Sequence, residues 1–502
     1  MKKIKTKLEK SIKSVILIAI GNGKKNKKTI QKQTKMNLKI KYLFALSLSF
    51  LLTAQSGFSQ SAKTKESLPQ IKVSKNQHYF VTENEKPFFW LGDTGWLAFG
   101  KLDRAGVDKY FKDRKDKGFN VVQVMVLHNI NAVNVYGDAA LINEDVSKPL
   151  TTAGNDFKSA QEYDYWDHVD YTLDVAQKNG IYLAMVPVWG TNVSKGNKVS
   201  KEQAIVYAKF LADRYKNRTN IIWLNGGDTH GNEFMDIWNA IGNTLKTNNP
   251  NQLVTFHPFG RTDSSENYHN EKWLDFNMFQ SGHRRYDQDS VKTNFKEDNY
   301  KFVLRDFKLK PTKPTLDGEP SYEGIPHGLH DTLQPKWTAS DVRRYGYWSV
   351  LSGGAGYTYG HNAVMQIFRK GDKPAYGNKE LWTSAINAPG AKQMIYIKKL
   401  MEEVPFLEGV PDVSLIANQG EKYDYIPAIK GEKYALLYTY NGRKIEVNMG
   451  KIGGEKVEAA WYNPRNGQKT KIGLIDNKGT QNFQPSGKKE DGNDWVLILK
   501  SK

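Results

Sequence analysis

The chain has 502 residues, 39% of them hydrophobic, which is enough for large apolar cores and predicts two or three domains. It contains no cysteine, which excludes disulfides, thiolate metal ligands and cysteine nucleophiles. The formal net charge is +20, but residues 1–50 hold 14 Lys and one Glu and account for +13 of it. The rest of the chain is mildly basic, without a concentrated basic stripe, so we expect no nucleic-acid partner.

Residues 36–60 have the pattern of a secretory signal, with a basic start, an apolar stretch at 43–52 and a small-residue exit. The apolar stretch is shorter than the ~20 residues that span a membrane, so we expect no stable membrane insertion after cleavage. A second basic run fills residues 1–35. We interpret Met36 as the true start; the alternative is one signal with a long basic region. Residues 1–60 are thus predicted to be a basic extension and signal peptide of a secreted or periplasmic protein.

Between residues 68 and 402, short apolar runs alternate with helical patterns. The runs lie at 87–92, 120–127, 181–190, 220–226, 253–258, 275–281, 314–318 and 354–360. Helical spacing is seen from Trp166 to Ala176 and from Ala204 to Tyr215, and 338–351 and 391–402 also read as helices. Eight such units predict a (β/α)₈ barrel. A doubly wound sheet is the alternative, disfavoured because no Gly-rich loop follows the first run.

Two further segments differ from this pattern. Residues 129–165 form a long insertion after the second run, and we interpret it as a wall of the binding cleft. Residues 405–502 contain short strands and Asn-Gly turns, which predict a small β-sandwich. Within it, Asn441-Gly442 between 434–440 and 444–448 predicts a β-hairpin, a second Asn-Gly lies at 466–467, and 494–500 reads as a final strand.

Polar or aromatic residues follow most of the eight runs of the predicted barrel, where the active site of such a fold is built. They are Asp93, His128, Trp189, Asp228, His257, Gln280, His283, Glu319, Tyr359 and His361. The histidine spacing matches no compact metal motif, so we expect sugar contacts and neither a metal nor a cofactor.

Asp228 and Glu319 are the candidate catalytic pair. Asp228 follows the fourth run after two glycines, and Glu319 follows the seventh, with Pro320 favouring an extended backbone. Two carboxyl groups facing each other across a barrel mouth are what glycoside hydrolysis needs. The alternative for Asp228 is a helix cap. As candidates for the catalytic carboxyl opposite Asp228, Glu319 ranks first, Asp317 second and Glu323 third.

Other side chains have supporting roles in this interpretation. Asn225 could hydrogen-bond a hydroxyl, and Asp93 could contact the sugar or orient Asp228, with a helix cap as the alternative. Trp96 and Trp189 could stack on a sugar face or belong to the core. The remaining candidates for substrate binding are His128, His257, Gln280, His283, Tyr322, Tyr359 and His361.

Several motifs together resemble the apiosidase-like catalytic domain, glycoside hydrolase family 140. They are Trp90-Leu-Gly-Asp-Thr-Gly-Trp96, Asp113-Arg114 with Lys117-Gly-Phe-Asn-Val-Val-Gln123, Trp223-Leu-Asn-Gly-Gly-Asp228, Gln280-Ser-Gly-His283 and Asp317-Gly-Glu-Pro-Ser-Tyr-Glu323. The tail, with Trp461-Tyr-Asn-Pro-Arg-Asn-Gly467 and Asp494-Trp-Val-Leu-Ile-Leu499, resembles the small β domain, often labelled collagen-binding, that follows it. The resemblance implies release of apiose from pectic side chains, with Asp228 as general acid/base and Glu319 as nucleophile.

The sequence therefore predicts a secreted, retaining glycoside hydrolase that releases apiose or a related sugar from pectic or other plant polysaccharide side chains. The alternatives are a barrel glycosidase of different sugar specificity, a non-catalytic glycan-binding protein, and a matrix-adhesion protein acting through residues 405–502. Collagen binding is not expected, because nothing in those residues indicates a collagen groove.

Overall fold

The computed structural model describes residues 67–194, 198–289 and 295–502, so the predicted extension and signal peptide lie outside the described residues. The described part begins with a small antiparallel sheet of β1 (Ile71–Val73), β2 (Phe80–Thr82) and β3 (Pro87–Phe88). Phe80 contacts the rings of Trp90 and Phe276, which lie at the beginnings of two barrel strands. This sheet therefore covers the N-terminal end of the barrel.

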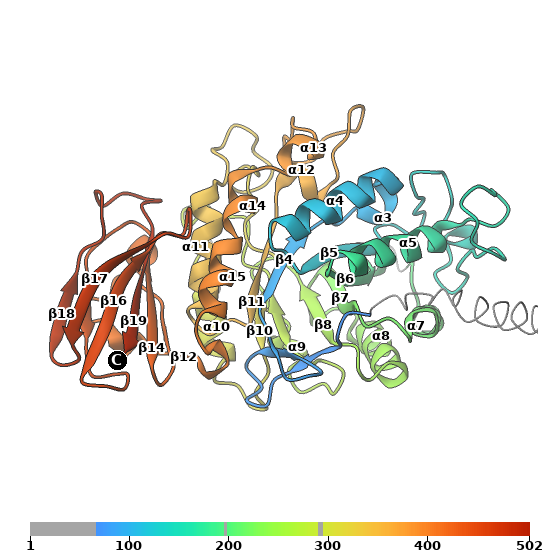
Figure 1. The fold of residues 1–502 in the computed structure, drawn as a ribbon. Coiled ribbons are helices and arrows are strands. Elements are labelled where there is room, and N and C mark those ends of the chain that lie inside the picture. Colours follow the sequence, from blue (N-terminus) through green and yellow to red (C-terminus); the bar gives the residue numbers. More distant parts are fainter. Residues whose placement is uncertain (1–66, 195–197, 290–294) are drawn as a thin grey trace, which may run out of the picture. The chain divides into compact units, whose positions relative to one another are not determined.

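Eight parallel strands form the centre of the fold (Figure 1). They are β4 (Trp90–Thr94), β5 (Val121–Leu127), β6 (Tyr182–Val188), β7 (Ile221–Thr229), β8 (Val254–Pro258), β9 (Asn277–Phe279), β10 (Thr315–Asp317) and β11 (Gly356–Tyr359). They are paired in the order β8-β7-β6-β5-β4-β11-β10-β9. The two ends of this order meet where the backbone nitrogen of Asp275 donates to the carbonyl of Val254 (2.8 Å). The predicted (β/α)₈ barrel is confirmed.

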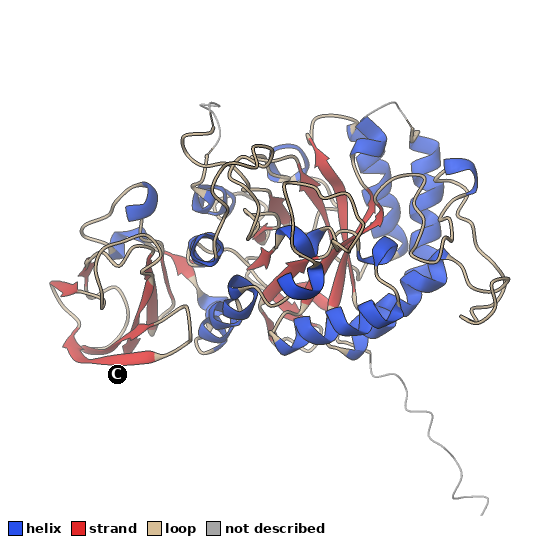
Figure 2. Ribbon diagram, turned by 90° about the horizontal axis from the view of Figure 1, so that it is seen from above, coloured by secondary structure: helices blue, strands red, loops and turns tan. Residues whose placement is uncertain are grey.

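Helices surround the strands (Figure 2). They are α3 (Ala98–Lys101), α4 (Arg104–Asp116), α5 (Tyr165–Lys178), α6 (Thr191–Ser194), α7 (Lys201–Tyr215), α8 (Met235–Asn248), α9 (Ser265–Tyr268), α10 (Asn299–Asp306), α11 (Ala339–Val350), α12 (Asn362–Met365), α13 (Trp382–Ala385), α14 (Pro389–Gln393) and α15 (Ile395–Glu402). Every residue of β5 and β6 is buried, because helices cover one face of each strand and the barrel core covers the other. Asp164 and Ser200 form capping boxes that fix the starts of α5 and α7.

Residues from 410 onward form an antiparallel β domain of two sheets, as the fold prediction requires. Its strands are β12 (Val410–Pro411), β13 (Ala428–Lys430), β14 (Tyr434–Thr439), β15 (Ile445–Asn448), β16 (Lys456–Tyr462), β17 (Lys469–Asp476), β18 (Thr480–Phe483) and β19 (Trp495–Ser501). It also contains the short 3₁₀ helices η3 (Val413–Leu415) and η4 (Lys422–Asp424), whereas η2 (Phe406–Glu408) precedes it and η1 (Ile142–Glu144) lies between β5 and α5. Six strands form the order β12-β13-β14-β19-β16-β17, and β15 pairs with β18 in a second sheet.

One prediction for this domain is wrong. The Asn441-Gly442 turn does not close a hairpin, because β14 pairs with β13 and β19 whereas β15 pairs with β18. Asn441 instead donates through Nδ2 to Asp424 (2.6 Å), and the chain passes from one sheet to the other at this point. The second Asn-Gly turn, at 466–467, does join two antiparallel partners, β16 and β17.

The β domain packs on α10 and α11 of the barrel. Arg343 on α11 makes two hydrogen bonds to Asp494, from Nε (2.8 Å) and from Nη2 (2.9 Å). Tyr347 stacks on Tyr438 with ring centroids 4.8 Å apart. Because the Arg343 and Asp494 side chains are 5% and 0% exposed, this contact is a buried junction between the two parts.

We expect Asp494→Ala to lower the free energy of unfolding by about 3–5 kcal/mol, because it leaves the buried Arg343 guanidinium without its carboxylate partner. Guanidinium denaturation followed by tryptophan fluorescence measures the change. Asp476→Ala removes an exposed carboxylate of β17 and is the matched control, expected within about 0.5 kcal/mol of the wild type. Equal stability of the two variants would contradict the junction.

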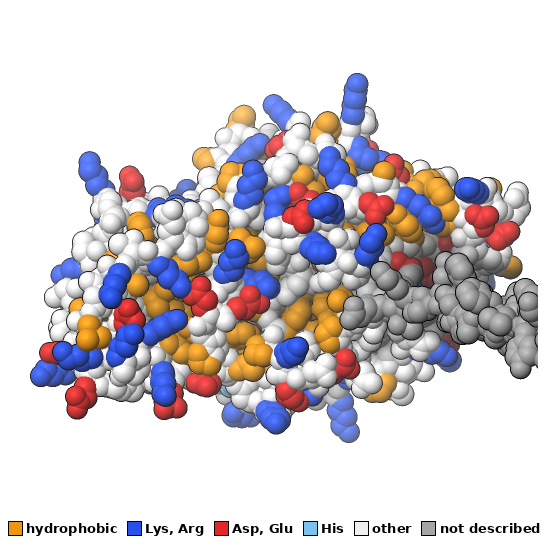
Figure 3. Space-filling model, in the orientation of Figure 1, with side chains coloured by type: hydrophobic (Ala, Val, Ile, Leu, Met, Phe, Trp, Pro, Cys, Tyr) orange, Lys and Arg blue, Asp and Glu red, His pale blue; other side chains and the backbone are white. Residues whose placement is uncertain are grey.

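On the face drawn in Figure 3, Lys and Arg side chains are interspersed with Asp and Glu. No helix in the described ranges is long and apolar enough to cross a membrane.

Candidate active site

A cavity of about 380 Å³ opens at the C-terminal ends of the barrel strands. Its volume lies within the range of small-molecule sites, roughly 300–1,000 Å³. The residues predicted from the sequence that line it are Trp96, His128, Trp189, Asp228, Gln280, His283, Glu319 and Tyr322. The structure thus brings both candidate catalytic carboxyls into one cavity.

The backbone at the end of β7 directs Asp228 into the cavity. Gly226 and Gly227 have φ of 87° and 107°, and Asp228 itself has φ of 47°, so the strand bends at these three residues. A Cβ on Gly227 would lie 2.4 Å from Cε3 of Trp189, so only glycine fits beside that ring. The first residue before α8 is Phe234, which shows that Asp228 is not the helix cap considered as its alternative role.

Glu319 is held by two imidazoles. Nε2 of His283 donates to its Oε1 (3.3 Å), and Nε2 of His257 lies 2.9 Å from its Oε2 in an ion pair. A Cβ on Gly318 would lie 1.8 Å from Cε of Met278, so glycine directly before Glu319 leaves the space that the Met278 side chain of β9 occupies. The Glu319 side chain is only 8% exposed, which places it at the base of the cavity.

The hydrogen-bond partners of the two imidazoles fix their protonation. Nδ1 of His283 accepts from the backbone nitrogen of Tyr322 (3.4 Å), so the proton of a neutral ring is on the Nε2 that faces Glu319. Nδ1 of His257 lies 3.2 Å from the carbonyl of Pro258, and its Nε2 faces the carboxylate. Both nitrogens of His257 thus face acceptors. Burial lowers the pKa of His257, but the Glu319 and Asp228 carboxylates outweigh burial and raise it overall.

The two carboxyl groups differ strongly in acidity. Burial first, and the charge of Glu319 second, raise the pKa of Asp228 to about 7. Burial also acts to raise the pKa of Glu319, but His257 and His283 outweigh it and hold that pKa at about 2. Below neutral pH, Asp228 is therefore a carboxylic acid while Glu319 is a carboxylate. One group can donate a proton and the other can attack as a nucleophile.

The separation of the two acids indicates which stereochemical course they can support. A carboxyl oxygen of Asp228, one of Glu319 and a ring nitrogen of His257 all lie within 4.8 Å of one another. Carboxyl groups ~5–5.5 Å apart are typical of retaining glycosidases, against ~6.5–9.5 Å for inverting ones.

The same three atoms of Asp228, Glu319 and His257 are the cluster, among the described residues, that could ligate a metal ion. A metal would require Asp228 to be deprotonated, which its raised pKa opposes below neutral pH.

Aromatic side chains form the walls of the cavity. Trp96 and Trp189 lie with ring centroids 5.5 Å apart, and both contact the ring of His257. Trp96 donates through Nε1 to the hydroxyl of Tyr322 (3.2 Å). These rings offer flat apolar faces, edged with polar atoms, beside the two acids.

Besides His257, which is fully buried and contacts Glu319 without lining the cavity, four of the predicted binding residues do not line it. Asp93 is fully buried and accepts from Tyr110 (2.6 Å) and Arg114 (3.1 Å) on α4. Asn225 donates to the carbonyl of Trp238 (2.7 Å) on α8. The other two are Tyr359, which donates to Glu323 (2.6 Å), and His361, which accepts from Ala363 at the start of α12. All four make internal contacts instead of facing the ligand space.

The lower-ranked acids are also internal. Asp317 accepts from Ser281 (2.6 Å) and Asn299 (2.9 Å), and it is fully buried. Glu323 accepts from the backbone nitrogen of Gly390 as well as from Tyr359. Their place outside the cavity leaves Glu319 as the carboxylate opposite Asp228.

Sequence reasoning missed the wall contributed after the eighth strand, above all Tyr376. Its backbone has φ of 51°, and its carbonyl accepts from Nδ2 of Asn362 (3.0 Å). Burial first, and then the charges of Asp228 and Glu319, raise its pKa, which places its hydroxyl near both acids. The one signal for it was its position in the loop that follows strand eight. Other lining residues missed include Lys101, Met125, Gln366 and Lys373.

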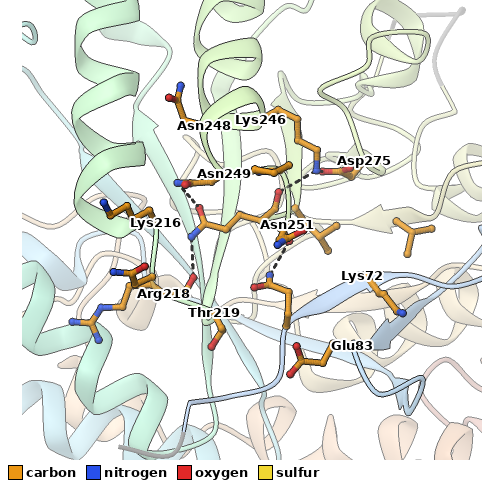
Figure 4. A pocket seen from close by; sticks show the side chains of 16 residues that line it. Lys72, Glu83, Lys216, Arg218, Thr219, Lys246, Asn248, Asn249, Asn251 and Asp275 are labelled. Atoms are coloured by element: carbon orange, nitrogen blue, oxygen red, sulfur yellow. Dashed lines mark hydrogen bonds and ion pairs between the residues drawn. The ribbon is translucent and has the colours of Figure 1, made fainter.

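A larger cavity, of about 720 Å³, lies at the opposite end of the barrel. Figure 4 shows the side chains that line it. It is lined by residues that precede the barrel strands, such as Thr219, Leu253 and Asp275, and Lys246 forms an ion pair with Asp275 there (2.7 Å). The two candidate catalytic acids do not line it. In barrels of this type the N-terminal end contributes to stability and the C-terminal end carries the chemistry, so the smaller cavity is the candidate site.

Comparison with known proteins agrees with this geometry. Residues 74–408 match the family model of the apiosidase-like catalytic domain, and residues 410–500 match "Putative collagen-binding domain of a collagenase". A solved structure described as a glycoside hydrolase is 44% identical, with 86% of this chain and 97% of that chain covered and a TM-score of 0.81. A glycoside hydrolase family 5 structure from Bacteroides vulgatus is 42% identical, with 86% and 94% covered and a TM-score of 0.81. No curated protein matches the chain.

These matches confirm the resemblance found in the sequence. The first family model covers more than half of the chain, and the two similar structures cover most of it. The chain belongs to the apiosidase-like family and is a glycoside hydrolase.

Proposed function

We propose that this protein is a retaining glycosidase that releases apiose or a related sugar from side chains of pectic or other plant polysaccharides. Asp228 is the general acid/base and Glu319 the nucleophile in this proposal. The observation that carries it is the pair itself, two carboxyl groups with oxygens within 4.8 Å in one cavity, and the raised pKa of Asp228 and the lowered pKa of Glu319 support the two roles. The match to the apiosidase-like family supports apiose as the sugar.

The reaction has two steps in this scheme. The Glu319 carboxylate attacks the anomeric carbon while Asp228 gives its proton to the leaving glycosidic oxygen, which breaks the glycosidic bond. Asp228, now ionised, then takes a proton from water, and that water displaces Glu319 from the anomeric carbon. The product keeps the original anomeric configuration, and both acids return to their starting states.

Neighbouring groups hold the two acids in these states. The ion pair with His257 and the hydrogen bond from His283 keep Glu319 ionised and fix its orientation for attack. Burial and the Glu319 charge keep the proton on Asp228 until the leaving oxygen takes it. Trp96, Trp189 and Tyr376 line the same cavity, which supports a role for them in contacting the sugar ring.

The sugar is tested by incubating the protein with oligosaccharides from pectin and identifying the released monosaccharides by chromatography and mass spectrometry. We expect apiose. Release of a different sugar would overturn apiose as the substrate and leave the glycosidase chemistry standing, and release of no sugar from any plant polysaccharide would overturn the proposal.

Export and the role of the β domain are part of the same proposal. The basic and apolar pattern of residues 36–60 supports secretion or a periplasmic location, which suits a polysaccharide substrate. The buried Arg343–Asp494 contact supports a β domain that stabilises the barrel, and we do not expect this domain to bind collagen.

We expect kcat/KM to be highest between about pH 2 and about pH 7 and to fall above pH 7. The lower limit applies only at pH values at which the protein stays folded. The active form needs Asp228 protonated and Glu319 ionised, with pKa values of about 7 and about 2. Raising the pH through 7 removes the proton from Asp228, so the acid catalyst is lost. Initial rates at fixed low substrate concentration measure the profile. Activity that increases through pH 7 would contradict the assignment of the acid.

We expect dialysis against EDTA to leave kcat/KM within about two-fold of the untreated enzyme, because the two-carboxylate reaction requires no metal ion. Added Zn²⁺ should inhibit, since it would compete with the proton of Asp228 and with His257 for Glu319. Loss of activity in EDTA that returns with a divalent metal would show that Asp228, His257 and Glu319 act as metal ligands.

A further inference from the structure

The catalytic cavity continues into a second hollow of about 240 Å³. Five residues line both spaces, so the two adjoin: Trp96, Leu97, Lys101, Met125 and His128. The far wall of the hollow comes from the insertion that follows β5, mainly residues 129–133, and from Tyr165 at the start of α5. Asp228 and Glu319 do not line the hollow, so it lies beyond the reacting bond.

This wall is fixed by internal hydrogen bonds. Asn192 accepts from the backbone nitrogen of Ile130 (3.2 Å) and donates to the carbonyl of His128 (3.0 Å). The backbone nitrogen of Ala140 donates to the carbonyl of Ala132 (2.9 Å), and Trp166 donates to the carbonyl of Ala140 (3.0 Å). The hollow is therefore a formed part of the structure, pre-organised before a ligand enters.

Its lining combines polar and apolar groups as carbohydrate sites do. Asn129 and Asn131 are exposed amides on this wall, while Trp96 and Tyr165 supply aromatic surface. Lys101 contributes no free charge, because its Nζ is paired with Asp372 (2.7 Å). A neutral hydroxylated ligand suits this lining better than an anionic one.

We propose that this hollow is a second sugar-binding subsite, which holds the ring next to the sugar bound between Asp228 and Glu319. The proposal rests on the proposed glycosidase function and extends it, because it makes the natural substrate an oligosaccharide with at least one ring beyond the bond that is cut. It also gives the insertion a role, as the wall that selects such a substrate.

Two variants test the subsite kinetically. Ala132→Trp fills the hollow, and Asn129→Ala with Asn131→Ala removes its amides. The readout is kcat/KM on an apiose-containing pectic oligosaccharide divided by kcat/KM on 4-nitrophenyl apioside. We expect each variant to lower this quotient at least about ten-fold. Ala153→Trp and Asn155→Ala alter exposed residues of the same insertion outside the hollow and are the matched controls, expected to keep the wild-type ratio. A ratio unchanged in both subsite variants would overturn the proposal.

A binding experiment separates failure of the subsite from failure of the proposed function. Glu319→Gln blocks turnover, and calorimetry then measures the Kd of the pectic oligosaccharide with and without Ala132→Trp. Binding that weakens at least about ten-fold in the double variant supports the subsite even if the wild type cleaves neither substrate. Equal Kd values would overturn the subsite alone, whereas no binding to Glu319→Gln itself would overturn the proposed substrate and the subsite with it. Circular dichroism checks the fold, and the Asn129→Ala/Asn131→Ala variant replaces Ala132→Trp if the latter misfolds.

Discussion

We expect Glu319→Gln to lower kcat at least about 10⁴-fold, the scale seen when a covalent nucleophile is removed. The amide has nearly the shape of the carboxylate but cannot attack the anomeric carbon or form the glycosyl–enzyme bond. Single-turnover assays with an aryl apioside and with the pectic oligosaccharide measure the loss, and it should be similar for both because the missing step is common to them.

The control for this variant is Glu233→Gln. Glu233 is exposed in the segment after β7, at the same end of the barrel as the cavity, and it does not line the cavity. It should retain wild-type activity. A Glu319→Gln enzyme that is folded, binds oligosaccharide and still turns over within about ten-fold of the wild type would exclude Glu319 as the nucleophile.

The second large effect is expected for Asp228→Ala, and its size depends on the leaving group. With a poor leaving group such as a sugar, kcat falls by about 10²–10⁴-fold, because proton donation is lost. With 4-nitrophenolate, which leaves without a proton, the first step is affected less, and hydrolysis of the glycosyl–enzyme becomes limiting. A burst of nitrophenolate should then precede a slow steady state.

Azide gives this variant a diagnostic readout. A small anion that needs no base can occupy the space left by the carboxylate and attack the glycosyl–enzyme. We expect azide to restore turnover of the aryl apioside by Asp228→Ala, giving a glycosyl azide with the substrate's anomeric configuration, and to have no effect on the wild type. Equal losses on both substrates without azide rescue would contradict the acid/base role of Asp228.

The barrel was predictable because its longer strands are mainly apolar runs. Val121–Leu127 and Tyr182–Val188 are buried along their whole length, and such runs are typical of parallel strands covered on both faces. The failed hairpin at Asn441-Gly442 shows the limit of local signals. The turn residues favour a tight reversal, but the pairing of β14 depends on β13 and β19, which lie elsewhere in the chain.

The two catalytic acids were predictable because each lies at a strand end between residues with special backbone preferences. Two glycines precede Asp228, and Gly318 and Pro320 flank Glu319. Position at a strand end does not say which way a side chain points. Asp93 and Asn225 lie near strand ends but contact α4 and α8. Tyr376 could not be predicted, because its place depends on a left-handed backbone and on the hydrogen bond from Asn362.

The most direct test of the paired-acid mechanism is to locate the covalent intermediate. Asp228→Ala is mixed with 4-nitrophenyl apioside, quenched in acid within the burst and digested with pepsin, and the peptides are sequenced by mass spectrometry. The mechanism predicts one apiosyl adduct, on the Glu319 side chain, in the peptide that contains Pro314–Tyr322. An adduct on another residue, or a burst of nitrophenolate with no adduct at any carboxylate, would contradict it.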